Sequence, residues 1–151
     1  MKRDPGLRRF SREHHAALVL AKRVQRMAAE EWQLTTPLIA EVLAIFARDI
    51  EPHFQAEEKG LLPSLQTEGT RPLAERTWAE HQMLRALVDR LAAGDAASLA
   101  PFGEALDAHV RFEERELFPA AQSVLAPETL SRIGRSDYPA HQRNTHIQGT
   151  R

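Results

Sequence analysis

The stretch His53-Phe-Gln-Ala-Glu57-Glu-Lys-Gly-Leu61-Leu-Pro63 decides the fold, because it returns later in the chain as His109-Val-Arg-Phe-Glu113-Glu-Arg-Glu-Leu117-Phe-Pro119. Both copies read H-x-x-x-E-E-[K/R]-x-L-[L/F]-P. On an α-helix, residues four positions apart lie on the same face, one turn from each other. Each copy therefore predicts a helix that presents one imidazole and one carboxylate toward the same side.

The repeat extends to the helix that precedes each copy, which carries one Glu-His pair: Glu13-His14 in the first half and Glu80-His81 in the second. Apolar residues follow the two histidines at identical offsets: Ala17, Leu20, Ala21 and Val24 in the first half, and Leu84, Leu87, Val88 and Leu91 in the second. This spacing is typical of an amphipathic helix. We therefore expect a chain built as two half-bundles.

Helical periodicity dominates the rest of the sequence. It predicts four helices: from about Ser11 or a few residues earlier to Trp32, from Thr36 through Leu61, from Pro72 to Ala93, and from Ala97 to Ser123. Pro52 lies inside the second helix and should bend it. Short connections favour an all-α fold, an antiparallel up-down four-helix bundle over residues 1–123. Residues 124–151 are expected to form a C-terminal extension, a surface-lying or mobile tail without chemistry of its own.

Composition narrows the classes of function. The chain has 151 residues, 42% of them hydrophobic, which suits one compact domain. It has no cysteine, so a transition metal would be held by imidazole and carboxylate. The net charge of −1 gives no general reason to bind nucleic acid or an anionic membrane, and no stretch approaches the roughly 18 apolar residues of a membrane span. We expect a cytoplasmic protein that binds small ligands.

The predicted inward faces of the four helices bring together four imidazoles and two carboxylates: His14, His53, His81, His109, Glu57 and Glu113. Buried carboxylates without a cation are costly, so this set favours a metal site over a set of ordinary core residues. Two carboxylates from neighbouring helices can bridge two cations, and histidines can complete each cation from outside. The sequence therefore predicts a dinuclear centre. Iron, manganese and zinc all suit such ligands.

His14 and His15 compete for one position on the first helix. His14 is the better candidate, because apolar residues line its face, whereas basic residues line the face of His15. Only His14 matches the Glu80-His81 pair of the repeat. Two further histidines, His141 and His146, lie in the predicted tail and are expected to be solvated rather than metal ligands.

Over about residues 7–123 the chain resembles the hemerythrin-like, or HHE cation-binding, family. The resemblance rests on Arg12-Glu-His14-His-Ala-Ala-Leu, on both H-x-x-x-E segments with their Leu-Leu-Pro63 and Leu-Phe-Pro119 endings, and on Glu80-His81-x-x-Leu84. It implies a four-helix bundle around a non-haem centre of two iron ions, with other divalent metals as alternatives. Terminal ligands would be His14, His53, His81 and His109, and Glu57 and Glu113 would be bridges.

The chain departs from the pattern of oxygen-carrying members of that family. Those proteins have a second histidine four residues from the third-helix histidine, where this chain has Thr77 and Arg85 around His81. They also have an aspartate five residues after the fourth-helix histidine, whereas Glu113 follows His109 by four. One metal ion would then have fewer protein ligands. A water, an exogenous ligand or a further carboxylate could fill the gap. The candidate carboxylates, expected instead to be solvated charges, are Glu58, Glu80, Glu114 and Glu116.

Three classes of function follow from the resemblance. The first is a di-iron protein that binds or senses dioxygen or a related small oxidant, or that handles iron. The second is an oxidase-like or peroxidase-like enzyme, although no catalytic acid or base can be named from the sequence. The third is a metal-stabilised interaction module with an unknown protein partner. The open coordination gives sensing, redox or iron-handling roles more weight than reversible oxygen transport. Trp32 and Trp78 are expected in helix-packing positions rather than as shields of the metal.

Overall fold

The computed structural model describes residues 2–29 and 35–135, and every regular element in these two segments is a helix. This confirms the predicted all-α class. The elements in chain order are α1 (Arg8–Ala29), α2 (Thr35–Ile45), η1 (Phe46–Ile50), α3 (Glu51–Ala56), η2 (Glu57–Leu61), η3 (Leu62–Ser64), α4 (Arg71–Ala92), η4 (Ala96–Ser98), α5 (Leu99–Phe112), η5 (Glu113–Leu117), α6 (Phe118–Val124) and α7 (Pro127–Arg135). Of the short elements, η1, η2 and η5 are single π-helical turns, and η3 and η4 are 3₁₀ turns.

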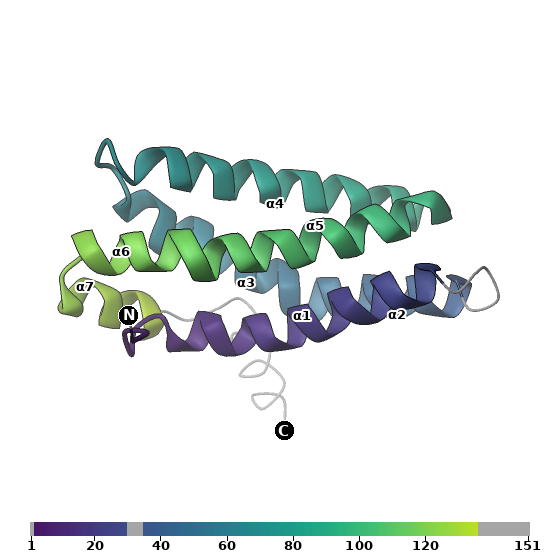
Figure 1. The fold of residues 1–151 in the computed structure, drawn as a ribbon, viewed down its shortest axis with the longest axis horizontal. Helices are drawn as coiled ribbons and strands as arrows, with labels where there is room; N and C mark the ends of the chain where they lie inside the picture. The colour runs from purple at the N-terminus through teal and green to yellow at the C-terminus, as the bar shows by residue number, and fades with distance from the viewer. Residues whose placement is uncertain (1, 30–34, 136–151) are drawn as a thin grey trace, which may run out of the picture.

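All of these elements except α7 follow one another end to end in four long helical columns, which pack antiparallel to form the bundle (Figure 1). The first column is α1, the second runs from α2 to η3, the third is α4 and the fourth runs from η4 to α6. Each column contacts the next around the bundle, with the most extensive contact between α1 and α5. The columns match the four predicted helices. Gly94, with a φ of 94°, ends the third one in the left-handed conformation that glycine adopts most easily.

The close approach of α1 and α5 depends on Gly103. A Cβ atom at this position would lie 2.9 Å from Cγ1 of Val24 and 3.2 Å from the carbonyl oxygen of Ala21. Any larger residue would push the two helices apart. Glycine thus costs helix propensity but allows the tightest helix contact in the bundle.

Two apolar clusters fill the two ends of the bundle. The first includes Leu20, Val42, Phe46, Leu84, Phe102 and Leu106, and the second includes Leu7, Phe10, Leu61, Phe112, Leu117 and Phe118. Burial of each such side chain stabilises the fold by roughly 1.5–3 kcal/mol before conformational entropy is counted. The band between the clusters is polar, and it contains the side chains that the sequence predicts as metal ligands.

The short helix α7 packs on the N-terminal end of α1 (Figure 1). Its residues Leu130 and Ile133 are buried in the second apolar cluster. Gly6 and Gly134 let the two segments touch, because a Cβ atom on Gly134 would lie 2.4 Å from the carbonyl oxygen of Gly6. Residues 127–135 of the predicted tail are therefore a packed helix. His141 and His146 lie outside the described residues.

The tryptophan expectation was wrong where the structure tests it. Trp78 on α4 is 50% exposed, so it belongs neither to the core nor to a shield around the polar band. The helix face that it occupies points to solvent because α4 directs His81 and Leu84 inward instead. Trp32 lies outside the described residues. Within the described part of the chain, no helix is long and apolar enough to cross a membrane.

Candidate metal centre

Six buried side chains meet between the two apolar clusters, and they are the six that the sequence predicts as metal ligands. They form two groups that share both glutamates: His14, His53, Glu57 and Glu113 in the first group, and His81, His109, Glu57 and Glu113 in the second. Within each group, one nitrogen or oxygen atom per side chain lies within 4.8 Å of all the others. All six residues are at most 5% exposed.

The Nε2 atoms of these imidazoles and the oxygens of the two glutamates face one another at ion-pair distances. Nε2 of His14 lies 2.9 Å from Oε2 of Glu113, and Nε2 of His53 lies 3.1 Å from Oε1 of Glu57. Nε2 of His81 lies 3.5 Å from an oxygen of both glutamates. Yet both oxygens of each glutamate, and Nε2 of His53, His81 and His109, have no hydrogen-bond partner.

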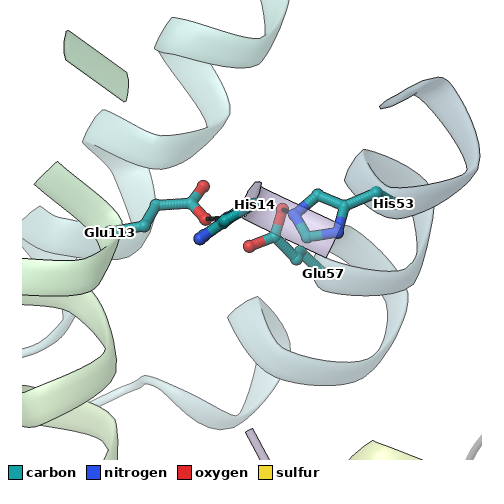
Figure 2. A group of neighbouring side chains, drawn as sticks. All are labelled: His14, His53, Glu57 and Glu113. Atoms are coloured by element: carbon teal, nitrogen blue, oxygen red, sulfur yellow. Dashed lines mark ion pairs between the residues drawn. The ribbon is translucent and has the colours of Figure 1, made fainter. Parts of the chain in front are cut away.

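Figure 2 shows the first group: His53 and Glu57 from one helix, His14 from α1 and Glu113 from η5 reach toward a common centre. Buried polar atoms are almost always hydrogen-bonded in folded proteins, and buried carboxylates are especially costly when they are not. Lone pairs that converge without a donor between them fit cations placed among them. The residues present therefore fit a pair of metal ions with Glu57 and Glu113 between them.

Proline residues introduce the π turns that interrupt the ligand-bearing helices. In η1 the N–H of Glu51 donates to the carbonyl of Phe46, five residues earlier, and Pro52 follows directly. In a regular α-helix the proline ring clashes with the carbonyl four residues before it, and a widened turn relieves this clash. The sequence predicted a bend at Pro52. The structure has a π turn there instead, just before His53.

A π turn before a proline also positions the two shared glutamates, Glu57 and Glu113. In η2 and η5 the residue before Pro63 or Pro119 donates its N–H to the carbonyl of Glu57 or Glu113, again five residues earlier. Both glutamates are therefore the first residues of π turns. The conserved spacing between glutamate and proline within the two copies explains why the two carboxylates enter the centre in the same way.

Each candidate imidazole contacts a second carboxylate through its other ring nitrogen. The Nδ1 contacts are His14 to Glu114 at 2.9 Å, His53 to Glu13 at 3.2 Å, His81 to Glu58 at 2.7 Å and His109 to Glu80 at 2.8 Å. We call Glu13, Glu58, Glu80 and Glu114 the outer glutamates. Since a carboxylate accepts hydrogen bonds, Nδ1 donates its proton, and a neutral imidazole then keeps its lone pair on Nε2, toward the centre.

Arginines hold three of the outer glutamates from the solvent side. Arg3 lies 2.8 Å from Glu114, Arg76 lies 2.8 Å from Glu80 and Arg85 lies 2.8 Å from Glu58. Burial opposes ionisation of these three glutamates, but hydrogen bonds from the histidines and arginines lower the pKa of each carboxyl. These carboxylates therefore stay negatively charged and can accept a hydrogen bond from Nδ1 of the imidazole.

The outer glutamates correct the sequence interpretation. Glu58, Glu80 and Glu114 were expected to be solvated helix-face charges, and all three instead hydrogen-bond to candidate ligands. The expectation failed because each is one residue away from a ligand, about 100° around the helix, and such a position reads as solvent-facing. Only Glu116 matches it: its side chain is 54% exposed, 3.5 Å from Arg76. The repetition of a glutamate beside His14 and Glu57 in one half, and beside His81 and Glu113 in the other, was the signal that could have identified them.

Without a cation, the buried carboxylates favour protonation of the imidazoles. Burial opposes protonation, but the charge of Glu57 and the hydrogen bond to Glu13 raise the pKa of His53 to about 10. Contacts with Glu113, Glu57 and Glu58 raise the pKa of His81 to about 11, and Glu113 raises that of His109 to about 9, in both cases against burial. Protons on the rings thus offset the buried carboxylates, and a metal ion would have to displace them.

Thr77 and Arg85 lie four residues either side of His81, where the sequence lacks a second histidine. Thr77 is fully buried, and its hydroxyl donates to the carbonyl of Leu73 at 2.8 Å. Arg85 bonds to Glu51 and Glu58 on the outside. Neither takes the place of a ligand, so each group has two imidazoles and the two shared carboxylates. The structure favours His14 over His15, which is exposed.

Comparison with known proteins agrees with this centre. A family model described as Hemerythrin HHE cation binding domain matches residues 6–121. The matched range contains all six candidate ligands and all four outer glutamates, and it stops before α7. No curated protein and no solved structure matches the chain.

Proposed function

We propose that this chain, which belongs to the hemerythrin HHE cation-binding domain family, holds two iron ions in its polar band. Through them it would bind or sense dioxygen or a related small oxidant, or handle iron. Cation binding follows from the family, and the buried His and Glu groups fit a metal site. The identity of the metal and of the small ligand is the proposed part.

One observation carries the proposal: the unpartnered atoms of Glu57 and Glu113. Both carboxylates lie fully buried between two pairs of imidazoles, and none of the described arginine, lysine or backbone N–H groups bonds to them. Ordinary core carboxylates pair with arginine, lysine or backbone N–H groups. Either protons on the imidazoles or cations at the centre must offset the burial of these carboxylates, and two divalent ions would do so for both groups at once.

The donor set suits redox-active iron with room for a ligand. Two imidazoles and two carboxylates are available to each cation, so an ion that accepts about six ligands keeps open positions. Bound iron would supply affinity for small oxidants and the capacity to change redox state. The chain's own residues hold the ions, keep Nε2 of each imidazole unprotonated through the outer glutamates, and exclude bulk water.

Exclusion of water rests on aromatic rings against the imidazoles. Phe54 stacks on His81 with ring centroids 3.8 Å apart, and Phe118 stacks on His14 with centroids 5.3 Å apart. Both phenylalanines are at most 1% exposed. A dry apolar surrounding tunes the redox potential of a metal and limits side reactions.

The test is elemental analysis together with an absorption spectrum on protein purified without a histidine tag, first without air and then after exposure to air. We expect about two iron ions per chain and a near-ultraviolet absorption band that changes when dioxygen is added. A folded protein that contains two manganese or zinc ions would overturn the assignment of iron while keeping the metal centre. A folded protein that binds no metal would overturn the whole proposal.

A further inference from the structure

We propose that an apolar cavity beside the first group of ligands binds an uncharged organic molecule of about the size of one benzene ring. The cavity and its occupant go beyond the proposed function, and they do not depend on which metal is bound. The inference rests on the volume of the cavity, on the residues that line it and on the way the two halves of the bundle differ around it.

The cavity has a volume of about 200 Å³ and lies between α1, the helix from α2 to α3, and α5. Its walls are mainly apolar side chains: Ala17, Ile45, Ile50, Leu106 and Val110. Its inner end is formed by the rings of His14, His53 and His109. A molecule in this cavity would therefore touch imidazoles from both groups.

The cavity arises where the two halves of the repeat carry residues of different size. Ala17 follows His14 by the same offset as Leu84 follows His81, and Val110 follows His109 as Phe54 follows His53. Leu84 and Phe54 are at most 1% exposed, and Phe54 stacks on His81. Beside His81 the space is thus filled by large side chains. Beside His14 smaller ones leave it open.

The volume exceeds what a diatomic ligand needs. One water molecule occupies about 30 Å³ in the liquid, and an apolar cavity of about 150 Å³ is sufficient to bind benzene. A space of about 200 Å³ in contact with a metal centre therefore suits a single aromatic ring or an apolar molecule of similar size. Apolar burial drives its entry, because the walls offer few polar partners.

The opening of the cavity favours an uncharged molecule. Its exposed lining residues are Ala16, Arg48 and Asp49, which place the entrance between α1 and η1. The guanidinium of Arg48 is bound by the carboxylate of the adjacent Asp49 at 2.8 Å. The carboxylate of Glu13, which also lines the cavity, contacts Nδ1 of His53 at 3.2 Å. The charged groups at the entrance thus already have polar partners and offer none to an acid or a base.

The experiment is calorimetric titration of the purified, metal-containing protein with benzene and with toluene. We expect saturable binding with about one molecule per chain. The variants Ala17→Leu and Val110→Phe copy the larger residues of the other half into the cavity. Each should weaken binding at least about tenfold, because its side chain occupies the space of the ligand. Elemental analysis of each variant checks that the metal content is unchanged.

Two further variants complete the test. Val19→Leu changes an exposed residue on the same helix and should bind like the unaltered chain, since Val19 is 55% exposed. Val110→Ala enlarges the cavity and should admit a larger ring, such as naphthalene, that the unaltered chain excludes. Absence of binding to the unaltered protein, or equal binding by all variants that fold, would overturn the proposal. Neither result would affect the metal content on which the proposed function depends.

Discussion

Around His81 the bundle is filled, because Phe54 stacks on the imidazole and Leu84, three residues further along α4, is fully buried. Around His14 the corresponding residues are Val110 and Ala17, and a cavity of about 200 Å³ remains. The polar residues do not differ in this way. Glu114 contacts His14 as Glu58 contacts His81, with equivalent nitrogens in both halves.

This difference shows that the polar residues around the centre and the apolar residues that fill the bundle are under different requirements. The candidate ligands, the outer glutamates and the prolines that follow η2 and η5 recur in both halves, as expected if two cations of the same kind need the same surroundings. The apolar residues are free to vary, since many combinations fill a bundle equally well. The repeated residues thus fit a metal site, and the unrepeated ones leave the cavity in which we propose that an organic molecule binds.

The largest effects are expected from the ligands themselves. His53→Ala should lose the metal of the first group and His109→Ala that of the second, whereas Glu57→Ala combined with Glu113→Ala should remove the dinuclear centre, because both groups share these carboxylates. Metal content per chain by mass spectrometry measures all three. His15→Ala is the matched control and should keep both metals, since His15 is exposed. Full retention of two metals in the histidine variants would rule out the assigned ligands.

The protonated imidazoles predict an alkaline weakness of the metal-free protein. Their pKa values, about 10 for His53, 11 for His81 and 9 for His109, lie above the usual 6.5. The stability they contribute is fully present below pH 6.5 and is lost as the pH rises through these values. Metal-free protein should therefore lose unfolding free energy between pH 7 and pH 10.5.

Chemical denaturation at the two pH values measures this loss. The metal-loaded protein is its control, because there the cations replace the protons and the same change of pH should cost much less. A metal-free protein that is more stable at pH 10.5 than at pH 7 would contradict the arrangement of charges.

The outer glutamates should matter equally in the two halves. Glu58→Gln and Glu114→Gln each remove a carboxylate that holds one imidazole by its Nδ1 atom. Loss of such a partner typically weakens metal binding about 10–100-fold. Competition with a chelator of known affinity measures the change. Glu116→Gln, at an exposed glutamate on the same π turn, should leave the affinity unaltered. A strong effect in one half alone would break the symmetry inferred here.

The smallest expected effect concerns the prolines. Pro63→Ala and Pro119→Ala restore an N–H group and remove the ring that widens the turns holding Glu57 and Glu113. Metal affinity should fall by up to about tenfold, while the metal-free protein becomes more stable, because alanine is the better helix former. Chelator competition and thermal unfolding measure the two effects. If metal affinity and thermal stability instead changed in the same direction and by the same amount, the prolines would serve stability alone.

The sequence was sufficient to predict the bundle and all six candidate ligands, because helix geometry converts spacing along the chain into direction in space. The same repeat contained the outer glutamates, but single residues beside Glu57 or His81 read as surface positions. The π turns could be inferred only in part. Pro52 indicated that the helix would be irregular, but not that the irregularity would be a π turn. The cavity beside Ala17 depends on the volume of every neighbouring side chain, which no local pattern reports.

The central claim is that two cations lie between four imidazoles and share Glu57 and Glu113. Anomalous X-ray diffraction from crystals of the metal-containing protein tests it most directly. The account predicts two anomalous peaks inside the polar band, about 3.5–4 Å apart, as in other two-metal sites. One peak should lie among the atoms of the first group and the other among those of the second. A single peak, or peaks only on surface histidines, would contradict it.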